Sequence, residues 1–219
     1  MDLVGILLQG KSIEMAKVAG IVLAAGLSKR MGRPKLLLKL NNESVIYKVV
    51  RSALFSRLDE VVLVTGKNNI EILESLQDLS RHTKLKITHN KAPELGMSSS
   101  IKVGMVCLGS DRDGAMIILG DQPKLSTFII NTLGDAFSRS PTCIVAPTVC
   151  GRQTTPVVFP ARFFSALMSL KGDRGARPVI DSNPDAVIRI EVGEVYDDTD
   201  IDTLADWEKF KKEPGNKKA

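Results

Sequence analysis

Val18-Ala19-Gly20-Ile21-Val22-Leu23-Ala24 is the stretch of sequence that decides the fold. It is a nearly pure apolar run, and it ends just before Gly26. A run of this length is typical of a β-strand that is buried on both faces, as the strands of a parallel sheet are. Two further runs of the same kind, at residues 61–64 and 115–119, predict two more buried strands.

Strand and helix patterns alternate along the rest of the chain. Further strands are expected at 85–88, 144–146, 156–159 and 186–190, and helices at 43–58, 70–79, 98–108, 125–137, 161–170, 176–181 and 202–212. The alternation predicts a doubly wound, mostly parallel α/β sheet with helices on both faces and right-handed crossovers. Ligands bind such sheets outside the carboxyl ends of the strands, so chemistry is expected just after residues 25, 119 and 190. We expect one domain over residues 17–212, an N-terminal extension over 1–16 and a flexible basic tail over 213–219.

The composition is that of an ordinary soluble protein: 43% of the 219 residues are hydrophobic, 25% are charged, and the formal net charge is +5. Aromatic residues make up only 5%, so a nucleic-acid partner is not expected. No apolar run is long enough to span a membrane, and the apolar start lacks the basic leader of a signal peptide. Three cysteines without CxxC spacing argue against a disulfide scaffold. We therefore expect a cytoplasmic monomer or weak oligomer that binds an anionic small molecule.

The segment after the first strand, residues 26–35, reads GLSKRMGRPK and combines two glycines with four cations. Glycine allows backbone N–H groups to converge on an anion, and Arg30 and Lys35 add positive charge where phosphates would lie. The segment matches neither the Walker phosphate loop nor the GxGxxG dinucleotide motif. It predicts a phosphate-binding loop of another kind, with a solvated basic turn as the alternative.

Asp121 follows the apolar run 115–119 after a single glycine. Pro123 forces Gln122 into an extended conformation, so a helix cannot begin at once and Asp121 is held at the edge of the sheet. A lone carboxylate in this position suits Mg²⁺, which takes few carboxylates together with water and substrate phosphate oxygens. The alternative is a surface turn with the sequence Gly-Asp-Gln-Pro.

Both segments resemble signatures of one protein family. Residues 23–35, Leu-Ala-Ala-Gly-x-Ser-x-Arg-Met-Gly-x-Pro-Lys, and residues 120–123, Gly-Asp-Gln-Pro, are similar to those of the MobA-like nucleotidyltransferases, which include the molybdenum cofactor cytidylyltransferases and guanylyltransferases. The resemblance implies the Rossmann-like fold of the nucleotide-diphospho-sugar transferases. It also implies a set of residues that bind the nucleotide: Leu23, Ala24, Ala25, Gly26, Ser28, Arg30, Lys35 and Asp121. Of these, Arg30, Lys35 and Asp121 would be catalytic. Members with Ala-Ala-Gly in the first loop tend to use CTP and those with Ala-Gly-Gly tend to use GTP, so Ala25 points to CTP.

Two further segments resemble family blocks near the nucleotide. In residues 90–101, Gly96, Ser98 and Ser99 are expected to lie near the base and ribose, although serines before an apolar periodic run are also ordinary N-caps. Residues 197–203 resemble an Asp-Ile-Asp-Thr segment beside the metal. Asp200, or else Asp202, would complete metal binding there, while capping of the last helix is the alternative for these acids.

One segment that resembles the part of the family pattern that binds the acceptor substrate departs from that pattern. Thr154-Thr155 stands where a fourth block usually has Gly-His or Gly-Asn before proline, which leaves the identity of the acceptor open. Residues 172–177 match a loop of the type Gly-Asp-x-Gly-Ala-Arg. That loop would contact a pterin or its phosphate, or else form a helix start capped by Asp173. Gln122, Thr154, Thr155 and Arg177 are therefore predicted to face the acceptor.

The resemblance implies transfer of CMP from CTP to molybdopterin with release of pyrophosphate, assisted by Mg²⁺ or by Mn²⁺ in its place. An apo molybdenum hydroxylase would then be a further partner. Three alternatives stay open: a GTP-using guanylyltransferase, a related cytidylyltransferase for a sugar or polyol phosphate, and a non-catalytic carrier of the cofactor.

Overall fold

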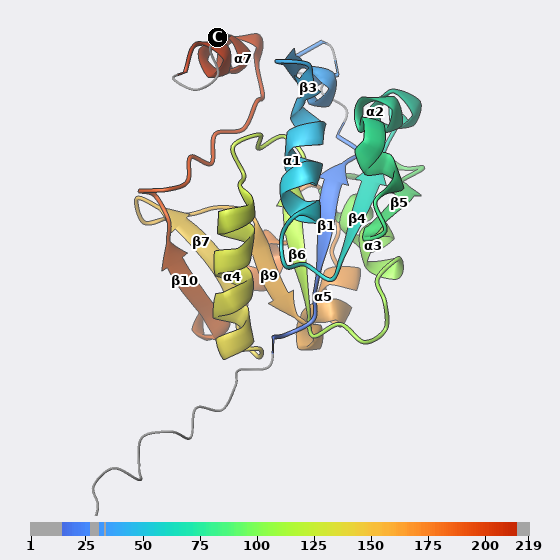
Figure 1. Ribbon diagram of the computed structural model, residues 1–219. Coiled ribbons are helices and arrows are strands. Elements are labelled where there is room, and N and C mark those ends of the chain that lie inside the picture. Colours follow the sequence, from blue (N-terminus) through green and yellow to red (C-terminus); the bar gives the residue numbers. More distant parts are fainter. Residues whose placement is uncertain (1–14, 27–30, 33, 214–219) are drawn as a thin grey trace, which may run out of the picture.

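The computed structural model describes residues 15–26, 31–32 and 34–213. Ser28 and Arg30, two residues predicted to bind the nucleotide, lie outside the described residues. Within the described ranges the chain forms an eight-stranded sheet with helices on both faces and a separate two-stranded hairpin (Figure 1). The expected mostly parallel α/β fold is confirmed.

The order across the sheet is β10-β7-β9-β6-β1-β4-β5, and β8 pairs with β7 outside this path. The strands are β1 (Val18–Ala24), β4 (Glu60–Thr65), β5 (Leu85–His89), β6 (Gly114–Leu119), β7 (Ile144–Val149), β8 (Arg152–Gln153), β9 (Val157–Pro160) and β10 (Val187–Glu191), with β2 (Lys39–Leu40) and β3 (Glu43–Ser44) in the hairpin. Only β8 and β9 run against the other strands of the sheet. The first predicted strand, β1, lies between β4 and β6 and is parallel to both.

Side-chain alternation along β1 divides the core into two layers. Val22 and Ala24 belong to an apolar cluster on one face of the sheet, and Ile21 and Leu23 belong to a cluster on the other face. All seven residues of β1 are buried, as expected for a strand covered on both sides. Because Leu23 lies level with Val64 of β4 and with a residue of β6, the carboxyl ends of these three strands meet at one edge.

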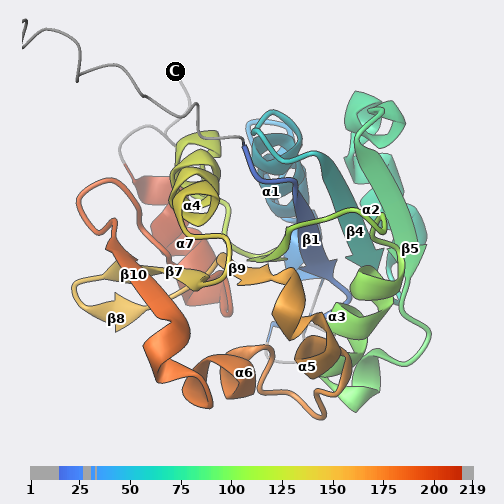
Figure 2. The same ribbon diagram turned by 90° about the horizontal axis from the view of Figure 1, so that it is seen from below.

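Seven α-helices cover the sheet in the described part of the chain. They are α1 (Val45–Leu54), α2 (Asn69–Ser75), α3 (Met97–Val106), α4 (Thr127–Arg139), α5 (Phe164–Met168), α6 (Arg177–Asp181) and α7 (Leu204–Lys212). Helices α1, α2, α4 and α7 contribute to the first cluster, and α3, α5 and α6 contribute to the second. Figure 2 shows α1 and α4 on one side of the sheet and α3, α5 and α6 on the other. None of the helices in the described ranges is both long and apolar enough to cross a bilayer.

Several helices begin later than the sequence predicts, and two of these starts bear on the hairpin and on the cleft. The helix expected from residue 43 begins at Val45, because residues 39–44 form the β2–β3 hairpin and Ser44 caps the helix by accepting from the Tyr47 N–H at 3.1 Å. The last helix begins at Leu204, and Thr203 is its N-cap, in a capping box with Asp206. Asp200 and Asp202 therefore do not cap this helix, and both lie along the cleft described below.

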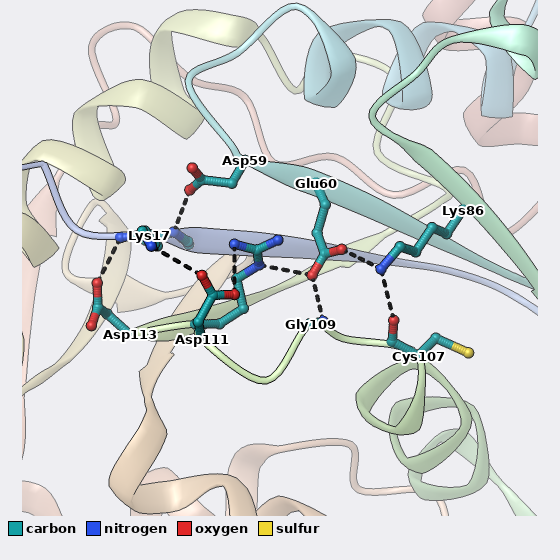
Figure 3. A network of polar contacts seen from close by, with 10 residues as sticks. Lys17, Asp59, Glu60, Lys86, Cys107, Gly109, Asp111 and Asp113 are labelled. Atoms are coloured by element: carbon teal, nitrogen blue, oxygen red, sulfur yellow. Dashed lines mark hydrogen bonds and ion pairs between the residues drawn. The ribbon is translucent and has the colours of Figure 1, made fainter.

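At the amino ends of β1, β4 and β5, charged side chains form a network of polar contacts (Figure 3). The Glu60 carboxylate, at the start of β4, accepts from Arg112 Nε and from the Gly109 N–H, both at 2.8 Å, and pairs with Lys86 Nζ at 2.6 Å. Lys17, just before β1, pairs with Asp111 at 3.0 Å. These contacts join β1, β4 and β5 to the loop that precedes β6. They lie at the amino ends of the strands, away from the edge where the carboxyl ends of β1, β4 and β6 meet.

Candidate functional site

A cleft of about 580 Å³ opens at the edge where β1 and β6 end. It is bounded by the end of β1, the 3₁₀ turn Lys35–Leu37, the start of α3, and residues 172–173 and 200–202. Seven residues predicted to bind nucleotide or metal line it: Leu23, Ala25, Gly26, Lys35, Gly96, Asp121 and Asp200. Asp202, the alternative metal residue, lines it as well.

Three residues predicted to bind the nucleotide do not line the cleft. Ala24 points to the opposite face of the sheet, because it alternates with Leu23 and Ala25 along the chain. Ser98, in the first turn of α3, is buried, and the Ser99 hydroxyl donates to the carbonyl oxygens of Gly96 and Ala92 at 2.8 and 3.1 Å. The serine of α3 that does line the cleft is the next residue, Ser100.

Gly120 brings Asp121 to the first loop. Its N–H donates to the Leu23 carbonyl of β1 at 3.0 Å, and a Cβ at this position would lie 2.7 Å from that oxygen. Since only glycine permits so close an approach, β6 stays hydrogen-bonded to β1 up to the residue before Asp121. The Asp121 carbonyl then accepts from the Ile201 N–H at 3.2 Å, which holds residues 200–202 at the same place.

Lys35 lies between two carboxylates of the cleft. Its ammonium is 2.5 Å from Asp121 Oδ2 and 2.7 Å from Asp202 Oδ1, and the neighbouring Leu36 is buried in the core. Burial by itself would lower the pKa of Lys35, but the two carboxylates outweigh it and raise that pKa. Lys35 is therefore a fixed positive charge at the floor of the cleft.

Among the described residues of the cleft, negative charge exceeds positive charge. Asp121 Oδ1 is buried and has no hydrogen-bond partner among the described residues. Asp200 is the third carboxylate: burial, reinforced by the charges of Asp121 and Asp202, raises its pKa to about 6. In the described part of the chain, three carboxylates face one ammonium group here, and a further cation would balance their charge and satisfy the unpartnered Asp121 oxygen.

The donor set fits Mg²⁺ better than a metal with an all-protein cage. Within the described ranges no three His, Cys, Asp or Glu side chains are grouped so that they could hold a metal by themselves. Mg²⁺ does not require such a group, because it is commonly bound by one or two carboxylates, waters and substrate phosphates. Asp121, with Asp200 or Asp202, supplies carboxylates of this kind.

A second cavity of about 770 Å³ adjoins the cleft and shares Met97 and Leu119 with it. Its apolar lining includes Ile117, Val157 and Phe159 of the central strands. Of the described residues, four arginines line it as well, namely Arg152, Arg174, Arg177 and Arg189, against one carboxylate, that of Asp181. Arg152 also pairs with Asp198, and Arg174 with Asp181, whereas Arg189 forms no ion pair within the described residues. The cavity suits a partly apolar molecule that carries negative charge.

Thr154, Thr155 and Arg177, all predicted on the acceptor side, line this second cavity. Gln122, the fourth residue of that prediction, is 2% exposed and lines neither space. Its Oε1 accepts from Thr155 Oγ1 at 2.8 Å and from the Tyr196 hydroxyl at 3.2 Å. Gln122 thus links the strand that carries Asp121 to the cavity wall.

The loop at residues 172–175 separates the two spaces. Gly96, with a φ of +88°, packs so closely on Gly172 that a Cβ there would lie 2.6 Å from the Gly172 carbonyl. Asp173 Oδ1 accepts from the Met97 N–H at 2.9 Å. Asp173 therefore caps α3, not the helix that follows it, since α6 begins only at Arg177 and has Ala176 as its N-cap.

Sequence reasoning missed several residues of this region. Ser100 is the third of three consecutive serines, and helical spacing alone did not distinguish which of them faces the cleft. Arg189 lies between two isoleucines in β10, a pattern that indicates only a half-buried strand. Tyr196 lies in an irregular segment without any motif. No local signal could have found Arg189 or Tyr196.

Comparison with known proteins places this geometry in context. Residues 20–187 match the family model of the MobA-like NTP transferase domain. The purine catabolism protein PucB of Bacillus subtilis (strain 168) is 32% identical over 194 residues, which cover 86% of this chain and 93% of PucB. The molybdenum cofactor cytidylyltransferase of Escherichia coli (strain K12) is 28% identical over 119 residues, which cover 54% of this chain and 59% of that enzyme.

The same fold occurs in a solved structure, that of Rv0371C from Mycobacterium tuberculosis H37Rv in complex with manganese. The TM-score is 0.73, with 22% sequence identity, and the match covers 90% of this chain and 98% of that protein.

Proposed function

This chain belongs to the MobA-like NTP transferase family, and from that premise we propose that it is a Mg²⁺-dependent cytidylyltransferase that attaches CMP to the molybdenum cofactor. NTP-dependent nucleotidyl transfer is the activity of the family. The observation that carries the finer proposal is the pair of adjoining spaces: a carboxylate-rich cleft with Lys35 and Asp121 on its floor, and an arginine-lined cavity beside it.

The reaction needs one bond to form and one to break. An oxygen of the acceptor phosphate attacks the α-phosphorus of CTP, and the bond from that phosphorus to the β-phosphate oxygen breaks, which releases pyrophosphate. A phosphate monoester is already ionised near neutral pH, so no strong general base is needed. Positioning and charge stabilisation supply the rate, as in phosphoryl transfer generally.

Lys35 and Asp121 have complementary roles in this proposal. The Lys35 ammonium would bind the triphosphate and offset charge that grows in the transition state. Asp121, with Asp200 or Asp202, would hold the Mg²⁺ ion, which supplies positive charge to the phosphate oxygens. The unpartnered Asp121 Oδ1 supports this assignment, since a buried carboxylate oxygen without a hydrogen bond is otherwise costly. Manganese in the mycobacterial structure supports a divalent cation in this fold.

The second cavity supports an acceptor with a pterin body and a phosphate group. Its apolar lining suits a flat heterocycle, and its arginines suit a phosphate that must reach the neighbouring cleft. The relationship to the Escherichia coli cytidylyltransferase supports the same acceptor. Ala25, which lines the cleft in the Ala-Ala-Gly sequence of the first loop, supports CTP as the donor.

The test is incubation of the purified protein with Mg²⁺, molybdenum cofactor and each of the four nucleoside triphosphates, followed by mass analysis and measurement of pyrophosphate. The expected product is the cofactor carrying CMP, formed with equal pyrophosphate and only with CTP. A product carrying GMP would show that the protein is a guanylyltransferase and not a cytidylyltransferase.

Two other results would require a different assignment of the acceptor or of the activity. Turnover only with a sugar or polyol phosphate would assign a different acceptor. Tight cofactor binding without pyrophosphate release, with any acceptor, would instead identify a carrier protein.

A further inference from the structure

We infer that Gln122 is a positioning residue for the cation: its amide orients the Asp200 carboxylate, and the hydroxyls of Thr155 and Tyr196 fix that amide from the wall of the second cavity. Thr155 therefore donates to Gln122 and not to the acceptor. The inference rests on the proposed function, because it takes Asp200 as the partner of Asp121 at the Mg²⁺ ion.

Gln122 lies between the two spaces and lines neither of them. It follows Asp121 in the chain and is 2% exposed. Its amide forms hydrogen bonds with the Asp200 carboxylate, which lines the cleft, and with the Thr155 hydroxyl, which belongs to a residue of the second cavity. A buried side chain of this kind acts on a substrate or a cation only through the residues that it contacts.

The orientation of the Gln122 amide is determined by its neighbours. Nε2 lies 3.4 Å from the Asp198 carbonyl oxygen, which can only accept, and it also donates to the Asp200 carboxylate. Oε1 then faces the two hydroxyls, and it accepts from Thr155 at 2.8 Å and from Tyr196 at 3.2 Å. The reversed amide would bring its oxygen against a carbonyl oxygen and a carboxylate, so this orientation is excluded.

The two hydroxyl groups are used inside the protein. The Thr155 hydroxyl gives its one proton to Gln122 Oε1, so it has none left for a phosphate of the acceptor. Tyr196 is buried, and its hydroxyl lies 3.2 Å from Gln122 Oε1 and 3.1 Å from the Thr155 carbonyl oxygen. Tyr196 thus connects the backbone of the cavity wall to the same amide.

The direction of the Asp200 carboxylate matters because like charges surround it. Asp121 and Asp202 line the same cleft, and the three carboxylates repel one another. Asp202 is paired with Lys35 at 2.7 Å, whereas Asp200 accepts from the neutral amide of Gln122. Donors that hold a ligand carboxylate from behind typically change metal affinity by about 10- to 100-fold.

The first experiment measures Mn²⁺ binding to the whole protein, without nucleotide or acceptor, from the electron paramagnetic resonance signal of free Mn²⁺. Gln122→Leu, which cannot donate, should weaken Mn²⁺ binding about tenfold. Thr155→Val, which removes only the hydroxyl, should weaken it about threefold, the effect of one hydrogen bond. Thr155→Ser keeps the hydroxyl and should bind Mn²⁺ like wild type.

Thr154→Val is the matched control. Thr154 lines the same cavity, and among the described residues its hydroxyl does not contact Gln122. This variant should therefore keep the Mn²⁺ affinity of wild type. Wild-type affinity in Gln122→Leu, or an equal loss in Thr154→Val and Thr155→Val, would overturn the inference. Circular dichroism checks that each variant is folded, and if Gln122→Leu does not fold, the variants of Thr155 and Tyr196 decide.

The second experiment asks whether both hydroxyls act through the amide. Tyr196→Phe should weaken Mn²⁺ binding about threefold in the wild-type background. In the Gln122→Leu background neither Tyr196→Phe nor Thr155→Val should weaken it further, because the group that they orient is gone. Full additivity of these substitutions would show that the hydroxyls do not act through Gln122.

Failure of the proposed function would look different, because Mn²⁺ alone is the probe. If wild type bound no Mn²⁺, the metal assignment and this inference would fall together. If the variants followed the expected order of Mn²⁺ affinity and yet no acceptor were modified, the proposed reaction would be wrong and the role of Gln122 would stand. If CMP were transferred and all variants bound Mn²⁺ equally, only this inference would fall.

Discussion

Among the described residues, Asp121 Oδ1 is the only buried side-chain oxygen or nitrogen without a hydrogen-bond partner. Its other oxygen is bound by Lys35 at 2.5 Å, so the carboxylate is anchored on one side and open on the other. Buried polar atoms in native proteins are nearly always satisfied, and a bound ion is one physical reason for an exception. At the scale of single residues, this atom is the strongest structural argument for a bound cation.

Asp121→Asn should reduce kcat of the proposed transfer by about 10²- to 10³-fold, because it removes charge from a site that works by charge stabilisation. The fold should persist, because the asparagine side chain has the same shape as that of aspartate and still faces the cleft. Pyrophosphate release and thermal melting measure the two effects. Asp78→Asn, at an exposed carboxylate that lines neither space, is the control and should retain full activity. Activity of Asp121→Asn above a tenth of wild type would contradict the metal assignment.

At the scale of elements, the start of β4 depends on one buried carboxylate. The Glu60 side chain is 6% exposed and has two cationic partners and one backbone donor. Burial alone would raise the pKa of Glu60, but the hydrogen bonds from Arg112, Lys86 and Gly109 lower it to about 2, from an ordinary 4.5. The charged form therefore stabilises the fold above pH 4.5, and this contribution is lost as the pH falls from 4.5 towards 2.

Glu60→Gln should lower the free energy of unfolding by about 2 kcal/mol at pH 7, because Arg112 and Lys86 lose their counter-charge. The difference from wild type should shrink as the pH is lowered through the range below 4.5. Urea unfolding at several pH values measures it. Glu74→Gln, at an exposed position of α2, is the matched control and should leave stability unchanged at every pH.

The close contact between the start of α3 and the loop at residues 172–175 depends on Gly96. Gly96→Ala should destabilise the protein by about 1–3 kcal/mol, since alanine is strained at a φ of +88° and its Cβ would contact the Gly172 carbonyl at 2.6 Å. Gly134→Ala in α4 is the contrasting variant: nothing lies within 4 Å of its Cβ, and helix propensity should raise stability by up to about 1 kcal/mol. The denaturant midpoints of the two variants measure the difference. Equal effects on stability would contradict the close packing of Gly96 on Gly172.

At the scale of the whole molecule, two spaces adjoin at the carboxyl edge of the sheet, and the described residues that line them carry opposite net charge. Carboxylates and Lys35 line one, and arginines line the other. They share Met97 and Leu119, while the loop at residues 172–175 contributes residues to both. This arrangement would allow two substrates to bind side by side with separate recognition of each.

Arg177→Ala should raise the KM for the proposed molybdopterin acceptor about tenfold and leave CTP affinity unchanged, because Arg177 lines only the second cavity. Steady-state kinetics with each substrate varied in turn measures both. Arg139→Ala, which removes an exposed arginine at the end of α4, is the control for the loss of one charge and should alter neither constant. A loss of CTP affinity in Arg177→Ala would argue against separate sites.

Local patterns in the sequence determined the element types and their order. The apolar run 18–24 coincides with β1, because a strand buried on both faces needs an apolar residue at every position. The helix expected over 43–58 was too long at both ends. Asn41 and Asn42 adopt positive φ and turn the chain into a hairpin, which hydrophobic spacing alone does not predict. The sequence predicted the buried strand, the glycine-containing loop after it and the acidic residue at the end of a later strand, because each of these features occupies a few adjacent residues.

Only the tertiary structure decided which side chains meet. Lys35 contacts Asp121 across 86 positions of sequence and Asp202 across 167, because β1 and β6 are neighbours in the sheet and residues 200–202 return to the same edge. The choice of Ser100 over Ser99 follows from the rotation of α3 against Asn90. Periodicity specifies what each segment becomes, but strand order and helix rotation arise from packing of the whole core, and these bring distant charges into one site.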